Sequence, residues 1–176
     1  MEILNKILDL KTLDYKIKNL KSQNKTIVFC TGCYDILQPG HVIFFNQCRQ
    51  FGDVLIVGVG RDSTIKELKG ENRPVNPENN RIFLIASLEN VDYTVLNDKD
   101  ILPGKIDFAE ILKIIKPNVF VLNNDDLGIK EKSELCEKLN IQLKLVSRTV
   151  PPYLKPTSST EILKIRNSSL KCLTNQ

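Results

Sequence analysis

The sequence predicts an α/β fold: one doubly wound parallel sheet of five strands with helices on both faces. Short apolar segments rich in valine and isoleucine alternate with amphipathic segments about five times along the 176 residues. Strands joined through helices run parallel, with right-handed crossovers. The segment "DVLIVGVG" (53–60) is apolar without alternation, which is typical of a strand covered on both faces. A chain of this length builds one principal core, so we expect one main domain.

The expected strands are bounded by glycine, proline or asparagine, as strands commonly are. They cover 25–30, 53–60, 91–97, 118–123 and 141–147. Ahead of the first strand, residues 1–22 carry lysines between leucines and isoleucines, which predicts an N-terminal helical extension. The main domain would then cover 23–176 and have a Rossmann-like topology.

Helices are expected between these strands, because the apolar residues there recur at three- and four-residue intervals. They cover 41–52, 61–70, 107–116 and 130–140. A further helix opens near Pro77, since proline is favoured in a first turn. Pro117 ends the helix expected over 107–116, because proline cannot continue a helix. After the last strand, a proline-punctuated loop leads to a C-terminal helix for which Thr157 or Ser158 is a suitable cap.

The composition argues against several classes of partner. The net charge of +4 is spread along the chain without a block of five like charges, so we expect small anionic ligands and no nucleic acid. The longest apolar runs have strand length, and no membrane span is expected. The N-terminal stretch mixes acidic residues among its lysines and has no small-residue cleavage site, which predicts a cytoplasmic protein.

The five cysteines are expected to be reduced thiols, because their number is odd and their spacing irregular. Cys30 and Cys33 spell C-x-x-C, but zinc would need two more ligands and the chain has one histidine. A redox motif would open a helix with its first cysteine exposed, whereas Cys30 ends an apolar strand. We therefore interpret the pair as small residues packed at a strand end.

The segment "TGCYDILQPGH" (31–41) is the first candidate for a ligand-binding loop. It follows the first strand of the main domain, and doubly wound sheets bind ligands beyond the carboxyl ends of their strands. Gly32 lets the backbone approach a ligand, while Gly40 and His41 open the next helix, whose free N–H groups favour phosphate. Histidine at such a place can donate a hydrogen bond to a phosphate whose charge is being redistributed.

Four separated motifs resemble, in order, those of the nucleotidyltransferases that carry an HxGH motif, which include the cytidylyltransferases and several adenylyltransferases. They are "GCYDILQPGH", "LKGENRPVNPENNR", "LENVDYTV" and "TSSTEI", within roughly residues 15–166. The pattern is most similar to that of bacterial heptose 1-phosphate adenylyltransferases. This resemblance implies a nucleotidyltransferase domain over 23–176 that transfers an NMP group, with AMP favoured, to an acceptor such as heptose 1-phosphate and releases pyrophosphate.

The resemblance also implies roles for individual residues. His41 would steady the pentacoordinate phosphate, and Gln38, at the first position of the motif, would be a catalytic residue beside it. Lys69 would reach the triphosphate, and Arg81 would hold phosphate oxygens. The nucleotide would bind over Thr31, Gly32, Cys33, Tyr34, Gly40, Ser158, Ser159 and Thr160. Catalysis would rest on positioning and charge stabilisation, without a covalent enzyme intermediate.

The acceptor is expected at two aspartates. Asp35 would lie near the acceptor or order its loop, since aspartate commonly stabilises turns, and Asp125 would contact the acceptor. The implied partners are a nucleoside triphosphate and a small phosphorylated sugar or polyol, with Mg²⁺ as cofactor and no protein side chain as a metal ligand. The family's habit and the apolar N-terminal stretch favour a homodimer.

The sequence departs from the family pattern in two places. Gln38 stands where HxGH has its first histidine, and an amide donates hydrogen bonds but never carries a positive charge. The segment "VLNNDD" (121–126) stands where the heptose enzymes have "VKGGDY" and some cytidylyltransferases have "GDD". Two alternatives therefore stay open. One is a glycerol 3-phosphate type cytidylyltransferase, which Arg148 and Thr149 would also suit, and the other is a catalytically impaired nucleotide-binding protein.

Overall fold

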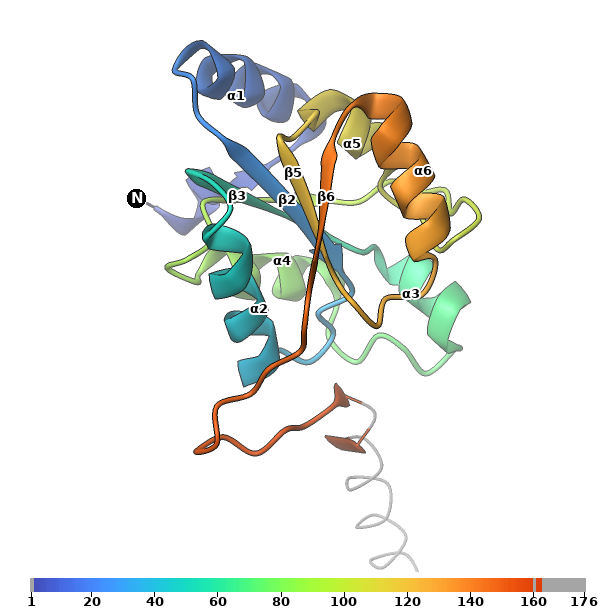
Figure 1. Ribbon diagram of the computed structural model, residues 1–176. Helices are drawn as coiled ribbons and strands as arrows, with labels where there is room; N and C mark the ends of the chain where they lie inside the picture. Colours follow the sequence, from blue (N-terminus) through green and yellow to red (C-terminus); the bar gives the residue numbers. More distant parts are fainter. Residues whose placement is uncertain (1, 160, 163–176) are drawn as a thin grey trace, which may run out of the picture.

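The computed structural model describes residues 2–159, 161 and 162. At its centre lies one sheet with the strand order β1-β4-β3-β2-β5-β6 (Figure 1). The strands are β1 (Ile7–Leu8), β2 (Ile27–Gly32), β3 (Val54–Val59), β4 (Tyr93–Leu96), β5 (Val119–Asn123) and β6 (Gln142–Val146). Neighbouring strands pair in parallel throughout. The predicted α/β class with a single parallel sheet is confirmed.

The predicted number of five strands is wrong, because the described sheet has six. The additional strand is β1, two residues inside the stretch 1–22 for which the sequence predicts only helix. It pairs with β4 at the edge of the sheet. Two residues are too few to show a strand periodicity, so the pattern of the surrounding helix masks them. Around β1 lie the 3-10 turn η1 (Ile3–Lys6) and helix α1 (Leu10–Ser22).

The expected helices between the strands are present, with ends shifted by a few residues. They are α2 (Pro39–Arg49), α3 (Asp62–Lys69), α4 (Glu78–Ala86), α5 (Ala109–Ile115) and α6 (Ile129–Leu139). Most of the predicted C-terminal helix lies outside the described residues. In the part of the chain that is described, no helix is long and apolar enough to cross a membrane.

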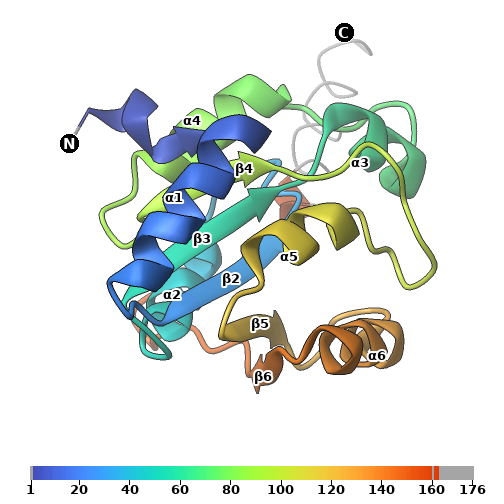
Figure 2. The same cartoon turned by 90° about the horizontal axis from the view of Figure 1, so that it is seen from above.

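Two hydrophobic clusters cover the two faces of the sheet. Alternate residues of β2 point to opposite faces, so Phe29 joins one cluster while Val28 and Cys30 join the other. Helices α1, α5 and α6 pack on the Phe29 side, and α2 and α4 on the opposite side (Figure 2). Cys30 is fully buried, and no disulfide joins it to Cys33, which agrees with its interpretation as a packing residue.

The strand order places a binding site between β2 and β5. From β2 the chain continues through α2 to β3 on one side, whereas β5 pairs with β2 on the other side. In doubly wound sheets this reversal leaves a crevice beyond the carboxyl ends of the two central strands. Those ends are Gly32 and Asn123, so the loops after β2 and β5 border the crevice.

Candidate functional site

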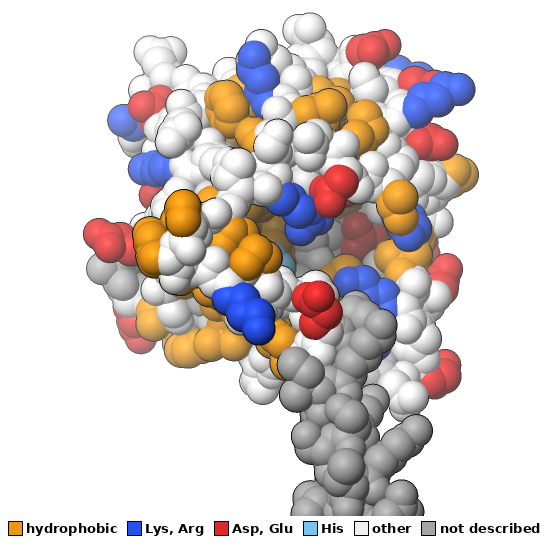
Figure 3. Space-filling view, turned by 60° about the horizontal axis from the view of Figure 1, so that its bottom comes forward, with side chains coloured by type: hydrophobic (Ala, Val, Ile, Leu, Met, Phe, Trp, Pro, Cys, Tyr) orange, Lys and Arg blue, Asp and Glu red, His pale blue; other side chains and the backbone are white. Residues whose placement is uncertain are grey.

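A cleft of about 650 Å³ lies beyond the carboxyl ends of β2 and β5. Figure 3 shows this hollowed face, with lysine and arginine side chains around the hollow. Most residues singled out from the sequence line it: Thr31, Gly32, Cys33, Tyr34, Asp35, Gln38, Gly40, His41, Lys69, Ser158 and Ser159. The fold therefore brings together the glycine loop, the lysine segment and the C-terminal motif. Thr160 lies outside the described residues.

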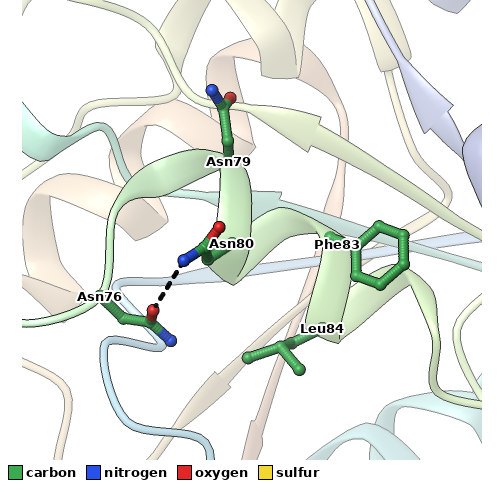
Figure 4. Close-up of a pocket in the computed structure, with 5 residues that line it drawn as sticks. All are labelled: Asn76, Asn79, Asn80, Phe83 and Leu84. Carbon is green, nitrogen blue, oxygen red and sulfur yellow. Dashed lines mark hydrogen bonds between the residues drawn. The ribbon is translucent and has the colours of Figure 1, made fainter.

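A second hollow of about 400 Å³ lies along α4 (Figure 4). Its lining consists of Asn76, Asn79, Asn80, Phe83 and Leu84, and the Asn80 amide donates to the Asn76 side-chain oxygen at 3.3 Å. None of these side chains is charged or titratable, so the hollow offers no group for acid–base chemistry or for neutralising a phosphate. The cleft at the strand ends is therefore the candidate active site.

The His41 imidazole is held in one orientation at the start of α2. Its Nδ1 accepts a hydrogen bond from the backbone N–H of Gln38 at 3.1 Å. A neutral imidazole carries one proton, so the proton must be on Nε2. The Tyr34 ring packs edge-on against the imidazole, with 5.4 Å between centroids and 86° between planes. His41 thus lines the cleft as an oriented N–H donor.

His41 is also kept uncharged. Burial, and then the positive charges of Arg148 and Lys69, lower the pKa of His41 from 6.5 to about 4. At neutral pH the imidazole is therefore neither a general acid nor a cation. The same two charges make the potential around His41 positive, which favours a phosphate beside it.

Four cationic side chains line the cleft, against two carboxylates. The cations are Lys69, Arg73, Arg148 and Lys155, and the carboxylates are Asp35 and Asp126. The ion pairs leave Lys69 without a carboxylate partner among the described residues. An exposed lysine at the rim, as Lys69 is, remains available to an anionic ligand.

Two glycines shape the loop for different reasons. A Cβ on Gly32 would lie 2.9 Å from the Tyr34 ring, so a side chain there would displace the ring that holds His41. A Cβ on Gly40 would meet no atom within 4 Å. Because Gly40 lines the cleft, the space beside it is open to a ligand that approaches the N–H groups of the helix start.

Asp35 orders the loop that faces the glycine segment. Its side chain is buried; Oδ2 accepts from Arg73 Nε at 2.5 Å, and Oδ1 accepts from the backbone N–H groups of Val75 and Asn76 at 2.8 and 2.9 Å. Of the two predicted roles for Asp35, ordering a loop is the one that these contacts describe. Its contact with an acceptor stays a prediction.

The resemblance predicts a phosphate contact for Arg81, whereas the structure places Arg81 outside the cleft lining. The side chain is fully buried. It donates to the Asn76 carbonyl at 2.8 Å, to the Cys33 carbonyl at 2.5 Å and to the Asp62 carboxylate at 2.8 Å. The guanidinium therefore joins the glycine loop to the loop before α4. These contacts describe a structural link, and a phosphate contact of Arg81 stays a prediction.

Sequence reasoning missed Arg73, which stands in its motif between Lys69 and Arg81. The Nη2 atom of Arg73 is buried and has no hydrogen-bond partner among the described residues. Buried donors normally have a partner, and Arg73 lines the cleft, so a ligand oxygen would satisfy this nitrogen. One sequence gives no signal that separates such a buried arginine from a surface one.

The two aspartates after β5 have different surroundings. Both oxygens of the predicted acceptor residue Asp125 accept from Arg148 Nε at 2.8 Å, and this pair is more than half exposed. Asp125 does not line the cleft, whereas Asp126 does. One oxygen of Asp126 accepts from the buried Lys132 ammonium. The cleft wall is therefore made by Asp126, and an acceptor contact of Asp125 stays a prediction.

The C-terminal motif caps a helix beside the cleft. The Ser158 hydroxyl accepts from the Glu161 backbone N–H at 3.1 Å, and the Glu161 carboxylate accepts from the Ser158 N–H at 2.8 Å. This is a capping box, so Ser158 is the cap. Gln38 is 8% exposed as a residue, and its amide lies against Thr157 and Ser159. The motif thus contacts the start of α2.

Comparison with known proteins agrees with these motifs. Residues 29–165 match the cytidylyltransferase-like family. The chain is 38% identical over 164 residues to the bifunctional protein HldE of Aliarcobacter butzleri, which covers 93% of this chain and 31% of that protein. It is 43% identical over 122 residues to HldE of Nitratiruptor, covering 69% and 25%. The chain spans a quarter to a third of the length of these curated relatives.

Solved structures show the same fold. The lipopolysaccharide core biosynthesis protein from Thermoplasma volcanium superimposes with a TM-score of 0.59 at 29% identity, covering 72% of this chain and 98% of that one. Pantoate-beta-alanine ligase from Francisella tularensis gives 0.61 at 19% identity, covering 92% and 76%, and shows the fold alone. The family match spans both the His41 loop and the C-terminal motif. The chain therefore belongs to the cytidylyltransferase-like family, as its motifs predict.

Proposed function

We propose that the protein is a nucleotidyltransferase that transfers an NMP group from a nucleoside triphosphate to a small phosphorylated sugar or polyol and releases pyrophosphate. The observation that carries the proposal is the neutral, oriented His41 at a helix start in a cleft with an excess of cations. AMP as the group and heptose 1-phosphate as the acceptor are favoured, supported by the heptose-type motifs and the similarity to HldE proteins.

In the proposed reaction an oxygen of the acceptor phosphate attacks the α-phosphorus in line. The bond from that phosphorus to the bridging oxygen breaks, and pyrophosphate leaves with the electron pair. His41 Nε2–H donates a hydrogen bond to an α-phosphate oxygen. This hydrogen bond is stronger in the transition state, where charge develops on the phosphate. The substrate supplies its own nucleophile, so the chain contributes position and charge without a covalent intermediate.

The other cleft residues bind the phosphates in this proposal. The N–H groups at Gly40 and the positive end of α2 face the α-phosphate side, and Lys69 reaches the outer phosphates. Arg73 Nη2 donates to the acceptor phosphate. No three acidic, cysteine or histidine side chains of the described residues are grouped as a metal site. Magnesium would therefore enter on the triphosphate oxygens, where it commonly keeps several waters.

Pyrophosphate release tests the proposal. Purified protein with magnesium is assayed with ATP, CTP, GTP and UTP against heptose 1-phosphate, glycerol 3-phosphate and other polyol phosphates. We expect release with ATP and heptose 1-phosphate. Folded protein that releases no pyrophosphate with any pair would contradict the proposal, and tight ATP binding without turnover would identify the impaired nucleotide-binding alternative.

A second candidate is a glycerol 3-phosphate cytidylyltransferase. It is supported by Arg148 and Thr149, which line the cleft as that alternative requires. The two candidates share the attack on the α-phosphorus and differ in base and acceptor. Release with CTP and glycerol 3-phosphate in the same assay would select the second candidate. A homodimer stays a prediction, to be checked by sedimentation.

A further inference from the structure

Two glutamines, one at the N-cap of α2 and one within it, hold the segment 147–159, which forms one wall of the cleft. At the near end of the segment, Gln47 Nε2 donates to the Ser147 carbonyl at 3.2 Å and to the Thr149 hydroxyl at 3.1 Å. At the far end, the Gln38 amide meets Thr157 and Ser159. Figure 1 shows the segment, in orange to red, passing the start of α2. The stretch between these two ties contains three prolines and an exposed Tyr153.

The orientation of the Gln38 amide follows from its neighbours. A backbone N–H can only donate and a backbone carbonyl can only accept. With its nitrogen toward Thr157, the amide donates to the Thr157 carbonyl at 2.5 Å and to its hydroxyl at 3.1 Å. Its oxygen then accepts from the Ser159 N–H at 2.8 Å and from its hydroxyl at 2.9 Å. All four groups are satisfied by one side chain.

The backbone of Gln38 has a separate task. Its N–H donates to His41 Nδ1, so the residue orients the imidazole through its main chain and the C-terminal motif through its side chain. Among the described residues, no other side chain outside the segment hydrogen-bonds to Thr157 or Ser159. Loss of the amide would therefore release the motif while leaving the His41 contact intact.

We propose that Gln38 is a positioning residue, whose amide fixes the Thr157–Ser159 end of the cleft wall relative to His41 and does so independently of pH. Its effect on the triphosphate rests on the proposed function, whereas its effect on the segment does not. Position 38 carries histidine in the family pattern. A neutral imidazole offers one donor and one acceptor, but an imidazolium has two donors and repels the Ser159 N–H.

An imidazole at position 38 would titrate, whereas an amide does not. Position 38 is buried in the cleft that holds Arg148 and Lys69, so the pKa of that imidazole should lie below its ordinary value, as the pKa of His41 does. The charged or titratable groups that line the cleft or border Gln38 among the described residues are Cys33, Tyr34, Asp35, His41, Lys69, Arg73, Asp126, Arg148, Lys155 and Glu161. Histidine is the side chain that ordinarily changes charge between pH 5.5 and 7.5, about one unit on either side of its usual value. Since the pKa of His41 is about 4, the wild-type protein should keep the hydrogen bonds between the Gln38 amide and Thr157 and Ser159 over that pH range.

The test compares Gln38→Ala and Gln38→His with the control Gln50→His. Gln50 ends the same helix with an exposed side chain, so the control adds an imidazole to α2 without touching the segment. The pKa of the introduced imidazole is first read by proton NMR titration. Amide hydrogen exchange of Ser159 is then measured by NMR at one pH above and one pH below that pKa and corrected for intrinsic rates. ATP affinity is measured by calorimetry at pH 7.5.

We expect Gln38→Ala to exchange the Ser159 amide roughly tenfold faster and to bind ATP roughly tenfold more weakly. Gln38→His should protect Ser159 while its new imidazole is neutral and lose that protection once the imidazole is charged, while wild type and Gln50→His stay protected at both pH values. Unchanged Ser159 exchange in Gln38→Ala, or equal protection by the neutral and the charged imidazole of Gln38→His, would overturn the proposal. Faster exchange in a protein that binds no triphosphate would leave the tie standing and refute the proposed function instead.

Discussion

A single imidazole links the sequence motif to the chemistry. The positive charges of Arg148 and Lys69 that keep His41 neutral also attract the anion that His41 would contact. Lys69 would bind the outer phosphates through its full positive charge. The neutral His41 donor would contribute mainly in the transition state, because its hydrogen bond strengthens as charge develops on the reacting phosphate.

His41→Ala should lower kcat by roughly 10² or more, because it removes a donor that acts in the transition state. ATP affinity should change much less, since Lys69 and the helix start remain. The measurement is steady-state pyrophosphate release together with ATP calorimetry. The Gln50→Ala variant, altered at the exposed end of the same helix, is the control. A His41→Ala enzyme with nearly full kcat would exclude the proposed role.

Stability should depend on pH through His41. Its pKa is about 4 in the folded protein and about 6.5 when unfolded, so between these values the unfolded chain binds more protons. The contribution is fully present above pH 6.5 and is lost as the pH falls toward 4, by up to about 3 kcal/mol. Urea unfolding at pH 7.5 and 4.5 measures it. In His41→Asn this part of the pH dependence should disappear, and an unchanged pH dependence would refute the folded-state pKa.

Arg73→Lys tests the buried nitrogen without a partner. Lysine keeps the positive charge beside Asp35. It has no second nitrogen, however, so it cannot pair with Asp35 through one nitrogen and offer another to a ligand, as the Arg73 guanidinium does. We expect the KM for the acceptor to rise roughly tenfold, with a smaller change in the KM for ATP. Equal changes in both constants would assign the residue to loop structure alone.

At the scale of elements, the start of α2 holds the site together. The helix contributes the open space at Gly40, the ring of His41 and, through Gln38, the anchor for the C-terminal motif. The buried ion pair of Asp35 with Arg73, and the pair of the buried Arg81 with the partly exposed Asp62 carboxylate, fix the loops on the other side of the glycine segment. Each of these loops follows a strand or leads into a helix, so the rigid sheet sets their spacing.

Gly40→Ala should separate folding from binding. An added Cβ meets no protein atom within 4 Å, and alanine is favoured over glycine in a helix by about 0.5–1 kcal/mol. The variant should therefore fold as well as wild type or better. Its methyl group would occupy the space where a phosphate approaches, so ATP binding should weaken at least roughly tenfold. Stability by urea and affinity by calorimetry are read on the same sample, and unweakened ATP binding would place the phosphates elsewhere.

At the scale of the whole molecule, the sequence predicts the parallel sheet and the place of the cleft because both depend on local patterns. Strand and helix periods, with glycine and proline at their ends, determine the order of the elements, and the order determines where β2 and β5 part. The strand β1 is too short to show a period. The family is predicted because several motifs occur together, and the match over residues 29–165 confirms it.

The functions of individual charged side chains were less accessible from the sequence, for a physical reason. Arg81 and Arg73 stand eight residues apart in one motif, yet the first has a partner for each part of its guanidinium and the second has a buried nitrogen without one. Burial and pairing depend on contacts between distant segments, such as that of Arg81 with Cys33. A sequence pattern lists such residues but does not pair them.

The binding of a triphosphate at His41 is tested most directly by proton NMR titration of this histidine, the only one in the chain, with and without magnesium ATP. In the free protein its pKa should be about 4. Bound phosphates would offset the charges of Arg148 and Lys69, so the pKa should rise on addition of ATP. A pKa near 6.5 in the free protein that ATP leaves unchanged would contradict both the buried, neutral state of His41 and its place beside the phosphates.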